Sequence, residues 1–237
     1  MRVLLFLVCL AALPARGEEV DLELVLLADA SGSIDNAEAA FQRQGYAIAM
    51  TDPEVLRAIE TTAYGRIAVT FVEWASAGTE DVVVPWMVIE DMAGATAFAA
   101  ALAGPPRRAY GRNAIGSALL TGKRLIEDND IAGWRKELDF SGASANNFHG
   151  PSLASARAEV LAAGITINGL AITCSRCKGI PADARLEQTY REQIIGGPGA
   201  FVVTADDTKE FADAVKRKLI LEISGTLPAS QIARAAP

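Results

Sequence analysis

The chain has 237 residues, of which 51% are hydrophobic and 22% charged, which is enough apolar material for one domain with a sizeable core and excludes a disordered chain. Its 29 acidic residues outnumber its 22 lysines and arginines, so the net charge is −7. An acidic chain without a basic cluster argues against nucleic acid as the partner.

The first 17 residues have the pattern of a secretory signal peptide. Arg2 precedes an apolar run over residues 3–13, and Ala15-Arg16-Gly17 supplies a small-x-small cleavage site. The apolar run is too short for a permanent membrane anchor, so we expect a periplasmic or secreted chain that starts at Glu18 and has no transmembrane segment after cleavage. Cleavage removes two arginines and no acidic residue, which takes the net charge from −7 to −9.

Residues 24–33 predict a buried strand that ends in a polar loop. The five apolar residues 24–28 are typical of a strand buried on both faces, as in a parallel sheet. Asp29, Ser31 and Ser33 follow the strand, at the edge where open α/β sheets bind their ligands. One carboxylate and two hydroxyls within five residues form a donor set suited to Mg²⁺ or Mn²⁺.

The rest of the chain alternates helical and strand patterns. A helix follows Asp35, whose spacing to Glu38 predicts a capping box, and a second begins at Pro53 and runs to about residue 59. Further helices are expected at 93–102, 114–127, 151–164, 182–195 and 207–221, and strands at 67–74, 82–88, 138–141, 165–172 and 201–203. The connection 75–80 is too short for a helical crossover, so the strands that flank it should pair antiparallel.

This alternation predicts one α/β domain over residues 18–223, followed by a loose tail over 224–237. The domain should hold a doubly wound, mostly parallel six-stranded sheet with one antiparallel edge strand and helices on both faces. Pro85 lies in the strand expected at the edge, where proline is tolerated.

Several segments resemble the von Willebrand factor A (vWA) domain. Asp29-Ala30-Ser31-Gly32-Ser33 after a buried strand is similar to the first motif of that family's metal-ion-dependent adhesion site (MIDAS). Residues 65–69, 84–86 and 164–170 are similar to segments of an uncharacterised family of secreted bacterial vWA proteins. The resemblance covers nearly the whole mature chain. It implies a cation ligated by the three residues of the first motif, with an open position that an acidic residue of a protein partner completes.

The chain departs from the family pattern in the second and third loops of that site. Asn113 stands where the family has a threonine, and Ala143 stands where it has an aspartate. The Asn113 carbonyl oxygen can ligate a hard cation, and the alternative is that Asn113 is a helix N-cap. Ala143 offers no oxygen, so the resemblance implies a partly degenerate site that binds its cation more weakly.

Further polar residues lie in the third loop. Ser144, Asn146 and Asn147, together with His149, can contact a ligand or substitute for the missing aspartate. The alternative is a solvated loop without a binding role.

Cys174 and Cys177 are the cysteines that remain after signal cleavage, and in an oxidising compartment they can form a small disulfide loop. The alternative is a redox Cys-x-x-Cys motif. A redox motif normally opens a helix after an early strand, whereas this pair follows a late strand, so we favour the structural disulfide.

Three functions remain open on these observations. The first is an exported, non-enzymatic binding module that recognises a protein through a Mg²⁺ or Mn²⁺ ion. The second is a metal-independent vWA scaffold for protein interaction. Ala143 favours this alternative, because it offers no oxygen where the family has an aspartate. The third is a periplasmic thiol-disulfide or hydrolytic enzyme, but a serine hydrolase would need Gly-x-Ser-x-Gly, which residues 28–33 do not supply.

Overall fold

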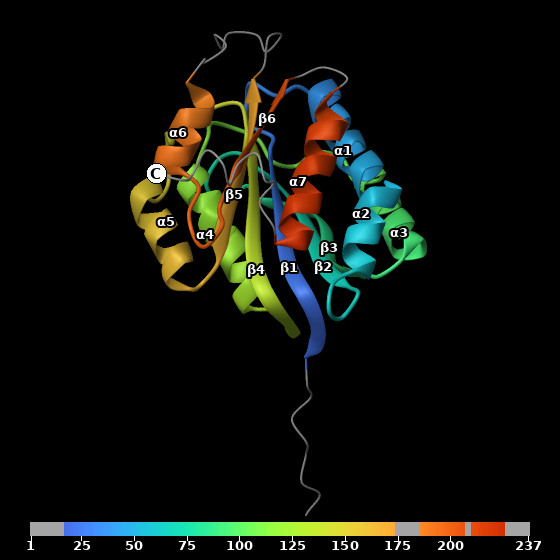
Figure 1. Ribbon diagram of the computed structural model, residues 1–237. Helices are drawn as coiled ribbons and strands as arrows, with labels where there is room; N and C mark the ends of the chain where they lie inside the picture. The colour runs from blue at the N-terminus through green and yellow to red at the C-terminus, as the bar shows by residue number, and fades with distance from the viewer. Residues whose placement is uncertain (1–16, 174–184, 207–209, 226–237) are drawn as a thin grey trace, which may run out of the picture.

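The computed structural model describes residues 17–173, 185–206 and 210–225 (Figure 1). Its strands are β1 (Glu18–Asp29), β2 (Ile67–Trp74), β3 (Asp81–Ile89), β4 (Ile131–Gly142), β5 (Thr166–Thr173) and β6 (Val202–Asp206). Its helices are α1 (Asn36–Met50), α2 (Pro53–Glu60), α3 (Met92–Ala103), α4 (Ile115–Glu127), α5 (Leu153–Ala162), α6 (Leu186–Gln193) and α7 (Phe211–Ser224).

The strands form one six-stranded sheet in the order β3-β2-β1-β4-β5-β6. Every neighbouring pair is parallel except β2 with β3, which is antiparallel and places β3 at the edge. The prediction of a doubly wound, mostly parallel sheet with one antiparallel edge strand is therefore confirmed. Because the sheet order reverses beside β1, the loops after β1 and β4 lie next to each other at the carboxyl edge, where such folds bind ligands.

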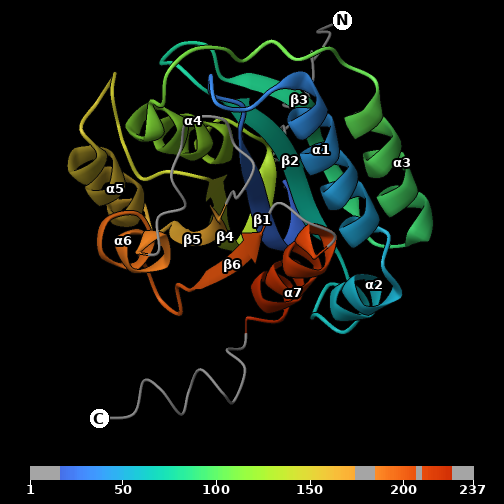
Figure 2. The same cartoon turned by 90° about the horizontal axis from the view of Figure 1, so that it is seen from above.

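Helices cover both faces of the sheet, as the view along the strands shows (Figure 2). Helices α1, α2, α3 and α7 pack on one face over an apolar core that includes Leu24 and Leu26 of β1. Helices α4, α5 and α6 pack on the other face over a core that includes Val25 and Leu27. β1 is thus apolar on both faces, which is why its sequence is a continuous hydrophobic run.

The capping residues in the sequence correctly predict where the first two helices begin. The Asp35 side chain accepts hydrogen bonds from the amides of Ala37 and Glu38, and the Glu38 carboxylate accepts one from the Asp35 amide, which completes the capping box. α2 has Pro53 at its first position behind Asp52.

Other boundaries differ from the prediction. β4 begins at Ile131, seven residues before the predicted start, because it pairs with the whole of β1 from Glu18 onward. α5 begins at Leu153 behind the N-cap Ser152, not at Pro151. α7 runs through Ser224 and ends at Gly225, whose φ of +64° is in the left-handed region that favours glycine.

Candidate functional site

Three loops meet at the carboxyl edge of the sheet. Loop 1 (residues 30–35) follows β1, loop 2 (104–114) precedes α4, and loop 3 (143–152) follows β4. The amide of Gly32 in loop 1 donates to the Gly111 carbonyl in loop 2 at 2.7 Å, and the amide of Phe148 in loop 3 donates to the Asn113 carbonyl at 2.8 Å. The structure therefore brings together the three segments on which the sequence placed the candidate site.

Asp29 ends β1 with its carboxylate buried beneath these loops. Its side chain is 2% exposed, and Oδ1 accepts a hydrogen bond from the Ser31 amide at 2.8 Å. Oδ2 faces the end of β4, where a Cβ on Gly142 would lie 3.2 Å from it and 3.1 Å from the Tyr190 hydroxyl. The Tyr190 hydroxyl donates to the Gly142 carbonyl at 2.8 Å, so this glycine lies between the phenol and the carboxylate.

Burial is the main influence on the Asp29 carboxyl and raises its pKa above the ordinary value. Hydrogen bonds from the Ser31 amide, the Ser31 side chain and the Ala143 amide, together with the charge of Arg107, act in the opposite direction but do not cancel it. A proton therefore competes for this carboxylate as the pH falls. A cation beside Asp29 would favour the ionised form.

Ser31 is completely buried, and its hydroxyl makes no hydrogen bond of normal geometry among the described residues, although it lies close enough to the Asp29 carboxylate to help lower the pKa of that carboxyl. Buried hydroxyls are nearly always satisfied, so this atom requires an explanation. It lies two residues beyond Asp29, and Ser33, which is half-buried, follows two residues later. An unsatisfied oxygen beside a buried carboxylate is what a hard cation needs from its protein ligands.

Asn113 is 8% exposed and lies in loop 2, where its carbonyl joins loop 3. Its alternative interpretation as the N-cap of the following helix is wrong. The N-cap of α4 is Ala114, and no side-chain hydrogen bond is made from that position. The Asn113 side chain is thus not committed to capping.

Asn147 of loop 3 supports α4 instead. Its Oδ1 accepts a hydrogen bond from the Gly116 amide in the first turn of α4 at 3.1 Å, and its Nδ2 donates to the Pro151 carbonyl at 2.9 Å. Ser144 and Asn146 form a local turn, with the Asn146 amide donating to the Ser144 hydroxyl at 3.1 Å. Ala143 is buried beside Asp29, and His149 is exposed.

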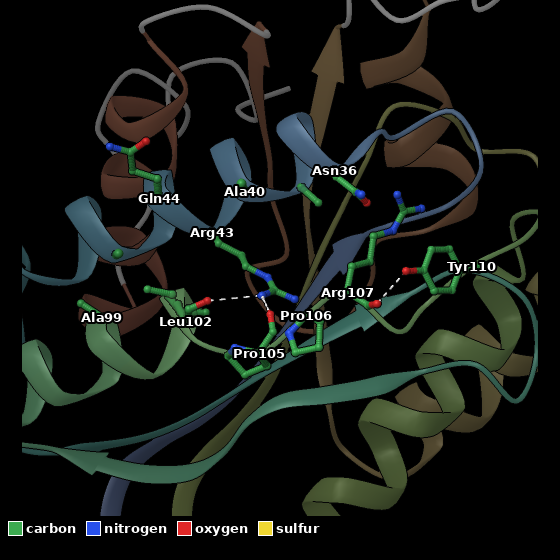
Figure 3. Close-up of a pocket in the computed structure, with 13 residues that line it drawn as sticks. Asn36, Ala40, Arg43, Gln44, Ala99, Leu102, Pro105, Pro106, Arg107 and Tyr110 are labelled. Carbon is green, nitrogen blue, oxygen red and sulfur yellow. Dashed lines mark hydrogen bonds between the residues drawn. The ribbon is translucent and has the colours of Figure 1, made fainter.

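Arg107 is a residue of this site that the sequence analysis missed. Its guanidinium donates hydrogen bonds to the carbonyls of Ala30, Ser31 and Ile34 and thereby fixes the backbone of loop 1. Tyr110 lies against the same side chain, with its hydroxyl donating to the Arg107 carbonyl at 2.7 Å (Figure 3). No sequence motif indicates that Arg107 supports loop 1, because the contact depends on how loop 2 folds against loop 1.

The donor set fits a weak hard-cation site. It combines one buried carboxylate, Asp29, with the hydroxyls of Ser31 and Ser33 and the amide oxygen of Asn113. The described part of the chain holds no group of three or more histidines, cysteines, aspartates or glutamates that could form a different metal centre. Cys174 and Cys177 lie outside the described residues.

Comparison with known proteins places the chain in a family. A family model described as "Protein of unknown function (DUF1194)" matches residues 19–227. The chain belongs to the DUF1194 family. No curated protein matches the DUF1194 chain.

Solved structures show the fold of the DUF1194 chain. The pilus adhesin SpaC from Lactobacillus rhamnosus GG is 15% identical with a TM-score of 0.56, over 89% of this chain and 31% of that one. Proximal thread matrix protein 1 from the mussel byssus, with a zinc-occupied MIDAS motif, is 17% identical with a TM-score of 0.60, over 89% of this chain and 50% of that one. A von Willebrand factor type A protein from Catenulispora acidiphila is 17% identical with a TM-score of 0.59, over 86% and 43%.

These similarities establish an α/β vWA-like fold for the DUF1194 chain, as the sequence resemblance implied. The chain spans half or less of the length of each of these three proteins. One of them carries a metal ion in its MIDAS motif, and another is an adhesin. Among the residues that the structure describes, no helix is both long and apolar enough to cross a membrane.

Proposed function

We propose that the DUF1194 chain is an exported vWA-type module that binds a protein partner through a cation held by Asp29, Ser31, Ser33 and Asn113. The observation that carries this proposal is the fully buried Ser31 hydroxyl, which lies beside the buried Asp29 carboxylate and makes no hydrogen bond of normal geometry among the described residues. A Mg²⁺ or Mn²⁺ ion would satisfy both groups at once. The convergence of loops 1, 2 and 3 supports the same conclusion.

The missing aspartate determines which partner the site would prefer. With Ala143 in loop 3, Asp29 is the only carboxylate in the proposed ligand set, so a bound divalent ion keeps an excess positive charge. A partner's aspartate or glutamate would neutralise that charge and complete the coordination. Ser144 and Asn146, on the adjoining surface of loop 3, would then contact the partner around that carboxylate, while Asn147 keeps loop 3 on α4.

A metal-independent scaffold is the second candidate, and Arg107 is the observation that favours it. Its guanidinium satisfies three carbonyls of loop 1, so the loop is held without an ion. A hydrolytic enzyme is less well supported. Ser31 is fully buried, and the one histidine of the chain, His149, is exposed in loop 3, so the site does not present a serine and histidine pair.

Thermal unfolding in a Mg²⁺ and Mn²⁺ series tests the metal-dependent function. A ligand that binds only the folded state at ten times its dissociation constant adds about 1.4 kcal/mol to the free energy of unfolding, so we expect the melting temperature to rise by about 3–6 °C. Asp29→Ala should abolish the rise. Glu60→Ala, which removes an exposed carboxylate at the end of α2, should retain it. A melting curve that no metal changes would leave the metal-independent scaffold.

A further inference from the structure

A second cluster of buried ionisable groups lies between α7 and the sheet. Lys218 of α7 is 0% exposed, as is Asp139 of β4, and Glu222, one turn further along α7, is 1% exposed. Lys218 Nζ lies 2.8 Å from Asp139 Oδ1 and donates a hydrogen bond to Glu222 Oε1. None of these three residues belongs to loop 1, loop 2 or loop 3 of the candidate cation site.

The three groups are poorly satisfied as an ionic network. One ammonium faces two carboxylates, and Asp139 Oδ2 and Glu222 Oε2 have no hydrogen-bond partner among the described residues. The neighbouring Glu137 has its own partners, because Arg135 lies 2.8 Å from one of its oxygens and Asn168 donates to the other at 2.8 Å. Taking ions out of water without full compensation is unfavourable, so the charged form of this cluster destabilises the fold.

The surroundings favour the neutral forms of the acids. Burial raises the pKa of Asp139, and it raises the pKa of Glu222 to about 8, with the charges of Asp139 and Glu137 acting in the same direction. The centroid of the Phe201 ring lies 5.7 Å from Lys218 Nζ, and Tyr46 of α1 adds a buried phenol near Asp139 and Glu222. Burial lowers the pKa of Lys218, but the charges of Asp139 and Glu222 outweigh this effect and raise it. One protonated carboxyl, one carboxylate and the Lys218 ammonium are therefore held together, and their charged neighbours include Glu137 and Arg135, whose guanidinium donates to the Glu222 carbonyl.

We propose that Lys218 and Asp139 condense to an intramolecular amide that joins α7 to β4, with Glu222 as the group that carries the proton. The two reacting side chains are on separate elements and already in contact, so the reaction needs no diffusion and little loss of entropy. The product replaces a buried ion pair by a neutral amide, which removes the cost of burying both charges.

The step is balanced within the cluster. Glu222 takes a proton from the Lys218 ammonium, and the neutral Nζ attacks the carboxyl carbon Cγ of protonated Asp139. A nitrogen–carbon bond forms, and Glu222 gives its proton to the leaving hydroxyl, so that a carbon–oxygen bond breaks and water leaves. Glu222 then takes the second proton from Nζ, which leaves an amide with one N–H and a protonated Glu222. No electrons are gained or lost. Glu222 remains beside the new amide, where its carboxyl can hydrogen-bond to it.

Mass spectrometry of the intact chain, unfolded in denaturant with its thiols reduced, tests this proposal. The cross-linked chain should weigh less than its sequence by one water, about 18 Da. Digestion with trypsin should give a branched peptide in which residues 137–157 are joined to 218–234, because the modified Lys218 is no longer cleaved.

Variants separate the chemistry from the fold. Lys218→Met should have the full mass of its sequence, and Glu222→Gln should condense slowly or not at all. Lys216→Met, which removes a partly exposed lysine from the same helix, should still lose one water. A wild-type chain of full mass overturns the proposal, as does a loss of water that maps to any other peptide, and neither result depends on whether a variant folds.

Discussion

At the scale of single residues, the candidate site combines a buried carboxylate, Asp29, with a half-buried guanidinium, Arg107, and the two are not in direct contact. Asp29 presents its carboxylate beneath loop 1, and Arg107 holds the carbonyls of the same loop. Asp29, Ser31 and Ser33 could be predicted because the motif is contiguous and follows an apolar strand. Arg107 and Tyr190 could not, because each acts through backbone carbonyls of a segment distant in sequence.

Arg107→Ala should loosen loop 1. Hydrogen bonds from a charged donor contribute about 1.5–3 kcal/mol, so we expect the free energy of unfolding to fall by about 2 kcal/mol, measured by chemical denaturation. The neighbouring Arg108 is exposed, and Arg108→Ala should change stability by less than about 0.5 kcal/mol. Equal effects of the two substitutions would show that Arg107 does not support the loop.

At the scale of elements, the sequence predicted strands best where they are apolar throughout. β1, β2 and β5 were placed within a few residues, apart from the polar N-terminal part of β1. The first half of β4 was missed, because Trp134, Arg135 and Lys136 give it no apolar pattern. Its position is determined by pairing and by Glu23 of β1, whose carboxylate accepts hydrogen bonds from the Gly133 amide and Asn129. Such tertiary hydrogen bonds leave no local signal.

Gly116 sets how closely α4 approaches loop 3. A Cβ at this position would lie 2.3 Å from the Pro151 carbonyl oxygen, so Gly116→Ala should destabilise the protein by about 1–3 kcal/mol although alanine favours helices. Gly104→Ala is the matched control, because no atom lies within 4 Å of its Cβ position and its φ of −85° suits any residue. Denaturant titration of both variants checks this, and a stabilising Gly116→Ala would contradict the packing described.

At the scale of the whole molecule, the α/β class and the antiparallel edge strand could be predicted, whereas the order of the six strands depends on long-range pairing and was not predicted. The domain bounds 18–223 stay a prediction; the family model matches residues 19–227. Cleavage of the N-terminal segment and the disulfide between Cys174 and Cys177 remain predictions. Mass spectrometry of exported protein should show a chain that starts near Glu18, with Cys174 and Cys177 two hydrogens lighter than the dithiol. Two free thiols in native material would exclude the disulfide, and an intact Met1 would exclude signal cleavage.

Calorimetric titration of the purified chain with Mg²⁺ and Mn²⁺ tests the central claim most directly, when the wild type is compared with Ala143→Asp, Asn113→Thr and the double variant. Ala143 is buried with its amide beside Asp29, so an aspartate there would add a second charge at the ion. We expect Ala143→Asp to tighten cation binding about tenfold and Asn113→Thr about twofold, because the second exchanges one neutral oxygen for another.

The two gains should not add independently, since both residues would serve one coordination shell. Without metal, Ala143→Asp should be slightly destabilising, because it places two carboxylates side by side. Cation binding that strengthens in this order, and that Asp29→Ala removes from the double variant, is the result that the account predicts. A folded double variant that binds no cation would contradict it, because the three loops would then not converge on a metal site.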